Sequence, residues 1–247
     1  PTDDERTLSK QAAPHVLFLI NEDPYNYEAT STIPPFAETL RNEYGHEATV
    51  LHAEGELPTL QFSGLEEALA EADVLVVFFR RAALPAEQLE AIKSYLDDGN
   101  SLVGVRTANH AFSVRDKEAV PEGYEFWWEF VPDILGAENR GYGPGDKGTN
   151  VEVADGAADH PILEGIDSEA WLSAGNVYHS APLLDDEAEV LLTGTIEGED
   201  EPVEPIAWTR TAGSSKVFYT SLGYPDDFEM SEFRTLLVNA IGWAVGG

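Results

Sequence analysis

Short apolar runs alternate with segments of helical periodicity along the first half of the chain. The runs have the length and composition of buried strands, and they lie at 15–20, 47–53, 73–79 and 101–105. The segments between them carry apolar residues three to four positions apart, as amphipathic helices do, and they lie at 34–44, 64–72 and 84–100. This alternation predicts an α/β fold with a mostly parallel sheet and helices on both of its faces.

Proline and glycine indicate where the predicted helices begin and end. Pro34 and Pro35 suit the first turn of the helix at 34–44, because an N–H in that turn has no partner within the helix. Gly45 and Gly99 follow two of the predicted helices and are typical of helix C-termini.

The second half of the chain has a different pattern. An aromatic-rich stretch at 124–136 predicts a helix that Pro132 kinks or restarts, and a glycine-rich loop follows at 139–150. Further strands are predicted at 151–154, 189–194, 205–210 and 216–221. The last two strands form a β-hairpin extension, and periodic apolar residues predict a final helix at 231–245. We expect a single domain over 15–247, preceded by a disordered or extended segment at 1–14.

Composition excludes several classes of protein. The chain of 247 residues has no cysteine, which rules out disulfides, thiolate metal ligands and a cysteine nucleophile. No apolar run approaches the ~20 residues of a membrane helix, so no membrane insertion is expected. The sequence begins at Pro1 without a methionine, which indicates removal of an export signal or cleavage of a tag. We favour export, and hence a periplasmic or secreted protein.

The charge of the chain is strongly negative. Lys and Arg number 14 against 46 Asp and Glu, a net charge of −32. Such a surface repels nucleic acid and anionic membranes, so neither is an expected partner. Because the acidic residues are scattered along the chain, we interpret them as an adaptation to salty surroundings rather than as a cation-binding surface.

Polar residues follow the predicted strand at 101–105 without a break. In parallel α/β sheets, ligands bind outside the carboxyl ends of the strands, where the strand order reverses. Side chains that follow three of the predicted strands should therefore share one crevice: Glu22, Arg80, Arg81, Arg106, Asn109 and His110.

The order of several motifs along the chain resembles the ThuA-like family, which is named for trehalose utilisation. The resemblance extends from about His15 to Ala244, and it rests on VGVRTANHAF, DILGAE, DHPILEGI, VYHSAPLL, VLLTGT, PIAWTR, KVFYTSLGYPDDFE and FRTLLVNAIGWA. It implies a flavodoxin-like sheet akin to that of the class I glutamine amidotransferases. It also implies a role in handling sugars, oxidised (3-keto) disaccharides or glycosides among them.

The chain departs from these relatives at chemically important positions. The amidotransferases place a nucleophilic cysteine on the turn after the strand that corresponds to 101–105, and this chain has none, so glutamine hydrolysis by a thiolate is excluded. Arg106 stands near that position, where many ThuA-like sequences have a histidine. Tyr142 and Tyr224 likewise stand where the family commonly has histidines.

His110 is the main candidate for acid–base chemistry, because an imidazole with a pKa of about 6.5 exchanges protons near neutrality. The alternative is a histidine held by hydrogen bonds within its loop. Glu22 and His179 are the candidates to assist it, against the alternatives of a solvated loop acid for Glu22 and a structural hydrogen bond for His179. His160 and Asp227 are assigned structural roles, in a turn and in capping the last helix.

The substrate-binding candidates are arginines, an amide and two tyrosines. An arginine at a strand end can hold a carboxylate, a phosphate or sugar hydroxyls, or it can pair with one of the many acids of this chain. The candidates are Arg80, Arg81, Arg106, Asn109, Tyr142 and Tyr224.

No cofactor is predicted. The chain lacks HExxH, a close histidine pair and a DxDxDG run, so nothing in it supports a divalent metal, and no GxGxxG follows the first strand. The leading hypothesis is a carbohydrate-processing protein that acts on a sugar or keto-sugar, as an isomerase or hydrolase, by acid–base chemistry at the carboxyl edge of the sheet. The alternative is a non-catalytic carbohydrate-binding module or scaffold that lost the amidotransferase nucleophile. A small-molecule carbohydrate is the expected partner, and formation of a homo-oligomer is left open.

Overall fold

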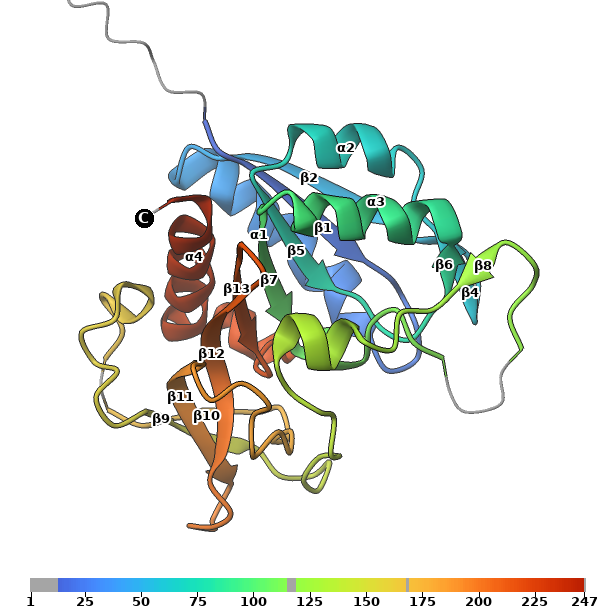
Figure 1. The fold of residues 1–247 in the computed structure, drawn as a ribbon. Coiled ribbons are helices and arrows are strands. Elements are labelled where there is room, and N and C mark those ends of the chain that lie inside the picture. Colours follow the sequence, from blue (N-terminus) through green and yellow to red (C-terminus); the bar gives the residue numbers. More distant parts are fainter. Residues whose placement is uncertain (1–12, 115–118, 168, 247) are drawn as a thin grey trace, which may run out of the picture.

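The computed structural model describes residues 13–114, 119–167 and 169–246, so most of the predicted segment at 1–14 lies outside it. Strands and helices alternate through the first half as predicted (Figure 1). These elements are β1 (His15–Ile20), α1 (Tyr27–Glu43), β2 (Glu47–His52), β3 (Glu54–Glu56), β4 (Thr59–Gln61), α2 (Leu65–Glu71), β5 (Val74–Phe78), β6 (Leu84–Pro85), α3 (Ala86–Asp97) and β7 (Ser101–Val105).

Short helical turns and strands make up the second half. They are η1 (Arg106–His110), β8 (Tyr124–Glu125), η2 (Phe130–Leu135), β9 (Thr149–Val153), η3 (Pro161–Leu163), β10 (Trp171–Ser173), β11 (Glu189–Ile196), β12 (Glu204–Ala212), β13 (Ser215–Thr220), η4 (Pro225–Glu229) and α4 (Ser231–Gly246). Among the residues that the structure describes, no helix has the length and apolar character needed to cross a bilayer.

Nine strands form one mixed sheet in the order β10-β9-β11-β12-β13-β7-β5-β1-β2. From β13 to β2 the neighbouring strands are parallel, and from β10 to β13 they are antiparallel. The predicted hairpin at 205–221 forms, since β12 pairs with β13, but it is an internal part of the sheet rather than an extension of it.

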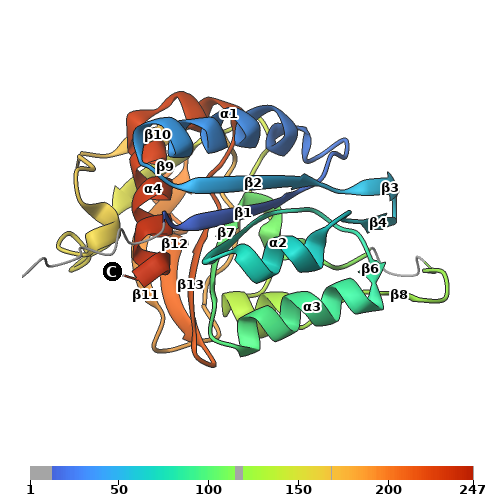
Figure 2. The same cartoon turned by 90° about the horizontal axis from the view of Figure 1, so that it is seen from above.

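Alternate residues of the parallel strands pack into two separate cores. In β1, Phe18 contributes to the core under α1 and α4, while Leu17 and Leu19 contribute to the core under α2 and α3. Figure 2 shows these two pairs of helices on opposite faces of the sheet. Strands buried on both faces lack alternation of apolar and polar residues, which explains their continuous apolar runs.

Helix α1 begins earlier than the sequence predicts. Pro34 and Pro35 lie inside it rather than in its first turn. Residues of the turns around the prolines are fully buried, among them Ala29, Ile33 and Ala37. Burial of this apolar face stabilises the helix enough to offset the hydrogen bonds that the prolines cannot donate.

The aromatic stretch at 124–136 is not one helix, contrary to the sequence prediction. It contains the short strand β8, a turn and the π-helical segment η2. Phe112, Trp127 and Phe130 pack against one another, and the ring centroids of Phe112 and Phe130 are 4.9 Å apart. Tertiary packing of the aromatic rings therefore decides the local backbone here.

The strand order reverses between β1 and β5. From β1 the chain passes to β2 on one side of the sheet and then to β5 on the other side. Ligands of open α/β sheets bind at such a switch point, outside the carboxyl ends of the strands. In this chain, those ends lead into the segments that carry Asn21, Asp23 and Arg80.

Gly223 should be intolerant of a side chain. It has a φ of +122°, and an added Cβ would lie 2.8 Å from Cγ1 of Val105 in β7. We expect Gly223→Ala to lower the free energy of unfolding by about 2–4 kcal/mol through backbone strain and overpacking. Gly242→Ala is the control, because its Cβ would meet nothing within 4 Å and alanine favours a helix. Urea denaturation measures both, and equal stabilities would contradict the expectation.

Candidate functional site

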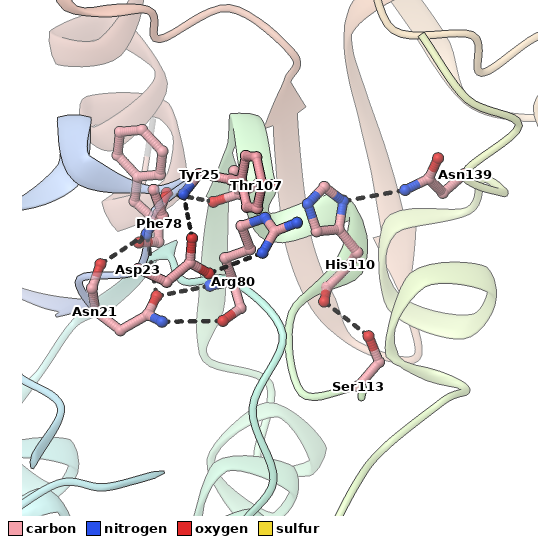
Figure 3. Close-up of polar contacts among 10 residues, drawn as sticks. Asn21, Asp23, Tyr25, Phe78, Arg80, Thr107, His110, Ser113 and Asn139 are labelled. Atoms are coloured by element: carbon pink, nitrogen blue, oxygen red, sulfur yellow. Dashed lines mark hydrogen bonds and ion pairs between the residues drawn. The ribbon is translucent and has the colours of Figure 1, made fainter. Parts of the chain in front are cut away.

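Buried polar side chains tie together the carboxyl ends of β1, β5 and β7. The amide of Asn26 donates to the backbone oxygens of Asn21 (2.8 Å) and Phe78 (3.2 Å). The hydroxyl of Thr107, in η1, donates to Oδ1 of Asn26 at 2.8 Å. Figure 3 shows these contacts at the ends of the strands. They fix the three strand ends relative to one another.

Arg80 is held from both its backbone and its side chain. The side chain of Asn21 accepts from the N–H of Arg80 (2.8 Å) and donates to its carbonyl oxygen (2.9 Å). Asp23, which is 5% exposed, pairs with the guanidinium at 2.9 Å (Figure 3). The guanidinium also lies over the ring of Tyr25, 4.9 Å from its centroid.

Arg106 occupies the turn after β7 in a strained conformation. Its φ of +43° lies in the left-handed region, which a non-glycine residue seldom adopts. The hydroxyl of Tyr219 donates to the carbonyl oxygen of Arg106 at 2.8 Å and so supports this turn. Strained backbone of this kind is found at functional sites, where the surrounding structure maintains it.

The guanidinium of Arg106 is buried without a carboxylate partner among the described residues. It donates to the backbone oxygen of Ser221 and to Oδ1 of Asn176, both at 3.1 Å. The rings of Tyr178 and Tyr224 also lie against it, with centroids 4.9 and 5.5 Å away. These contacts hold the positive charge of Arg106 near His110, whose pKa it helps to lower.

The contacts of Asn139 define the tautomer of His110. Oδ1 of Asn139 accepts the backbone N–H of Gly141 (3.1 Å), so the amide nitrogen faces His110 and donates to Nδ1 at 3.0 Å. An Nδ1 that accepts carries no proton, so the proton of the neutral imidazole is on Nε2. His110 therefore keeps an N–H on the ring nitrogen that Asn139 does not contact. Figure 3 shows the contact between Asn139 and the other ring nitrogen.

His110 is neutral at physiological pH. Burial above all, and then the positive charges of Arg81, Arg80 and Arg106, lower the pKa of His110 well below its ordinary value of 6.5. A neutral imidazole with a fixed Nε2–H can polarise a carbonyl or hydrogen-bond a hydroxyl.

A cavity of about 880 Å³ opens beside His110. Five residues that the sequence predicts for the site line it together: Arg80, Arg81, Asn109, His110 and Tyr142. Oδ1 of Asn109 is buried and has no hydrogen-bond partner among the residues that the structure describes. A buried acceptor of this kind lacks the donor that such groups usually have.

The structure places the other predicted site residues elsewhere. Glu22 is exposed and does not line the cavity, whereas its neighbour Asp23 points inward to Arg80. His179 does not line the cavity, and its Nδ1 lies 2.9 Å from a carboxylate oxygen of Glu204. Arg106 and Tyr224 lie against each other, and neither lines the cavity. The ring of Tyr178 lies between Arg106 and His110, and its centroid is 6.3 Å from that of the His110 ring.

His160 has the structural role predicted for it, whereas Asp227 has a different one. Nδ1 of His160 accepts the backbone N–H of Ile162 (3.1 Å) in the turn η3. The carboxylate of Asp227 accepts the N–H groups of Gly223 and Tyr224 at 2.8 and 2.9 Å. It therefore stabilises the start of η4 and not, as predicted, the start of the last helix.

Sequence reasoning missed Asp23, Asn139 and Tyr178. Asp23 carried a usable signal, since it comes directly after Glu22 in the segment that follows β1. Nothing in the sequence marks Asn139 as the partner of His110, because the two residues are brought together by η2 and the loop that follows it.

Metal ligands do not gather within the described ranges. No group of three or more His, Asp or Glu side chains there is arranged to hold a metal ion. The cavity contributes arginine, amide, imidazole and aromatic groups, which suit an uncharged polar or anionic organic ligand.

The fold and the cavity define an α/β protein with a polar cavity at the carboxyl edge of a mixed sheet. More particularly, the chain belongs to the ThuA family, described as trehalose utilisation, whose model matches residues 15–244. No curated protein matches it.

Solved structures similar to this chain share its fold. A protein assigned as ThuA-like from Bacteroides uniformis ATCC 8492 is 18% identical with a TM-score of 0.70, over 94% of this chain and 92% of that one. One from Parabacteroides merdae ATCC 43184 is 14% identical with a TM-score of 0.69, over 95% and 91%. The cytoplasmic protein STM1381 from Salmonella typhimurium LT2 is 14% identical with a TM-score of 0.57, over 93% and 99%.

The tautomer of His110 can be changed through Asn139. In Asn139→Asp a carboxylate replaces the amide donor, so Nδ1 must carry the proton and the pKa of His110 should rise. Nitrogen-15 NMR of the imidazoles, titrated against pH, follows both changes. Asn42→Asp, an exposed site with the same change of charge, is the control and should leave His110 unaltered. An Nδ1–H tautomer in the unmodified protein would contradict the assignment.

The lowered pKa of His110 also predicts a pH dependence of stability. Below pH 6.5 the unfolded chain binds a proton at His110 that the folded protein does not bind, so the free energy of unfolding falls as the pH falls. His110→Gln removes this contribution. Urea denaturation at pH 7.5 and 5.5 should show a smaller loss for the variant, and equal losses would refute the expectation.

Proposed function

We propose that this chain binds a carbohydrate in the cavity beside His110 and acts on it by acid–base chemistry. The observation that carries the proposal is the contact of Asn139 with Nδ1 of His110 at the wall of the cavity, which leaves the N–H of the neutral imidazole on Nε2. The family description, trehalose utilisation, supports a sugar or keto-sugar as the substrate class.

The composition of the cavity wall suits a polyhydroxyl ligand. Trp128 and Tyr142 offer exposed aromatic surface, 42% and 69% of each residue, against which the apolar face of a sugar ring can pack. Arg80 and Arg81 offer donors. Carbohydrate recognition uses this combination of aromatic and hydrogen-bonding groups.

A keto-sugar would use the site for enolisation. The Nε2–H of His110 would donate to the carbonyl oxygen, and the nearby arginines would stabilise the negative charge that develops there. The proton leaving the adjacent carbon needs a base, and Glu138 is the carboxylate among the lining residues. The proposed enzyme class is therefore an isomerase, with a hydrolase of keto-glycosides as the related alternative.

One observation favours a second candidate, a carbohydrate-binding module without catalysis. Glu138 pairs with Arg140 at 2.8 Å, and Nδ1 of His110 is occupied by Asn139, so both acid–base groups already have partners. The 880 Å³ cavity argues against a scaffold whose cleft has closed.

Three further expectations accompany the proposal. The order β2-β1-β5-β7-β13 supports a flavodoxin-like arrangement of the parallel strands. Export from the cytoplasm and a single domain over 15–247 stay predictions.

Turnover of 3-keto-glucosides tests the proposed activity. His110→Gln should lower kcat/KM by about 10²-fold or more, because loss of one hydrogen-bond donor to a developing oxyanion costs that much, while sugar affinity changes far less. His52→Gln, an exposed histidine away from the cavity, is the control. Sugar binding without turnover in the unmodified protein would support the binding module, and unaltered turnover in His110→Gln would remove His110 from the mechanism.

A further inference from the structure

Two cavities share one pair of arginines. Arg80 and Arg81 line the main cavity of about 880 Å³, and they also line a second cavity of about 310 Å³. The second cavity is formed by the segment after β1 and by the turn between β3 and β4, and its other lining residues are Asp23, Pro24, Tyr25, Leu57 and Pro58. Both volumes lie in the range of small-molecule sites, about 300–1,000 Å³.

Each cavity has an exposed aromatic wall. Tyr142 and Trp128 line the main cavity, and Tyr25, 64% exposed, lines the second one. Large apolar side chains seldom stay exposed in groups without a binding role. A tyrosine or tryptophan beside polar groups can cover one face of a sugar ring while the ring hydroxyls bond to its neighbours.

Arg80 is fixed at the junction of the two cavities. Asp23 accepts from its guanidinium at 2.9 Å, Asn21 holds its backbone from both sides, and Tyr25 stacks under it. A guanidinium has five N–H donors in a rigid plane, which can serve oxygen atoms on both sides. Because Arg80 is held by the protein itself, little entropy is lost when a ligand bonds to it.

We propose that the site binds an oligosaccharide of at least two sugar units, which lies across Arg80 and Arg81. One unit occupies the main cavity beside His110 and Asn109, and the next occupies the second cavity against Tyr25. This inference rests on the proposed carbohydrate function. The resemblance already implies disaccharides, and the inference adds the position of the second sugar unit.

Calorimetry compares sugars of one and two units. The probes are glucose, mannose and galactose beside trehalose, cellobiose, mannobiose and galactobiose. The disaccharide that binds best should exceed its monosaccharide by about tenfold in affinity, since a second unit adds contacts in the second cavity. If a monosaccharide binds as tightly as its disaccharides, the second unit has no site and the inference fails while the proposed function stands. If no sugar on the panel binds, the proposed function fails, and the inference fails with it.

Variants of the second cavity locate the second unit. Tyr25→Ala removes the aromatic wall, and Leu57→Trp fills the cavity from an exposed position that the fold should tolerate. Each should lower disaccharide affinity about tenfold toward that of the monosaccharide, and Leu57→Trp should leave monosaccharide affinity unchanged. Tyr44→Ala, a half-exposed tyrosine that lines neither cavity, is the control. Undiminished disaccharide affinity in both cavity variants would overturn the inference.

Discussion

Polar groups at the carboxyl ends of β1, β5 and β7 are buried and must find hydrogen-bond partners inside the protein. Asn26 meets most of this requirement, because it donates to backbone oxygens after β1 and at the end of β5 and accepts from Thr107 after β7. Leaving such a group unpaired costs about 1–3 kcal/mol, so the network favours one arrangement of the strand ends. The backbone segments that carry Arg80 and His110 are therefore held in fixed positions.

Positive charge is concentrated at this edge of a molecule whose net charge is −32. Arg80, Arg81 and Arg106 surround His110 closely enough to keep its imidazole neutral, and Asp23 holds Arg80 in place. The site thus combines a fixed N–H donor with cationic groups, an arrangement that stabilises a developing negative charge on oxygen. A histidine that is exposed to solvent would instead become positively charged below pH 6.5.

The second half of the chain completes the site. The segment after η2 supplies Asn139 and Tyr142, and its backbone pairs with the segment at 177–179. Tyr178 lies in that segment and connects Arg106 to His110 through its ring. The antiparallel part of the sheet supports both segments, so the cavity lies where the two halves meet rather than on the parallel strands alone.

Much of the fold and part of the site follow from the sequence. The apolar runs predict β1, β5 and β7, because strands buried on both faces have such a composition, and parallel strand ends meet at one edge. That rule brings Arg80, Arg81, Asn109 and His110 together. It does not decide between Glu22 and Asp23, whose directions depend on the path of the loop.

Only the tertiary structure decided the start of α1, the conformation of 124–136 and the pairing of His110 with Asn139. In each case packing between segments far apart in the chain outweighs local preference, and local preference is all that a single sequence displays.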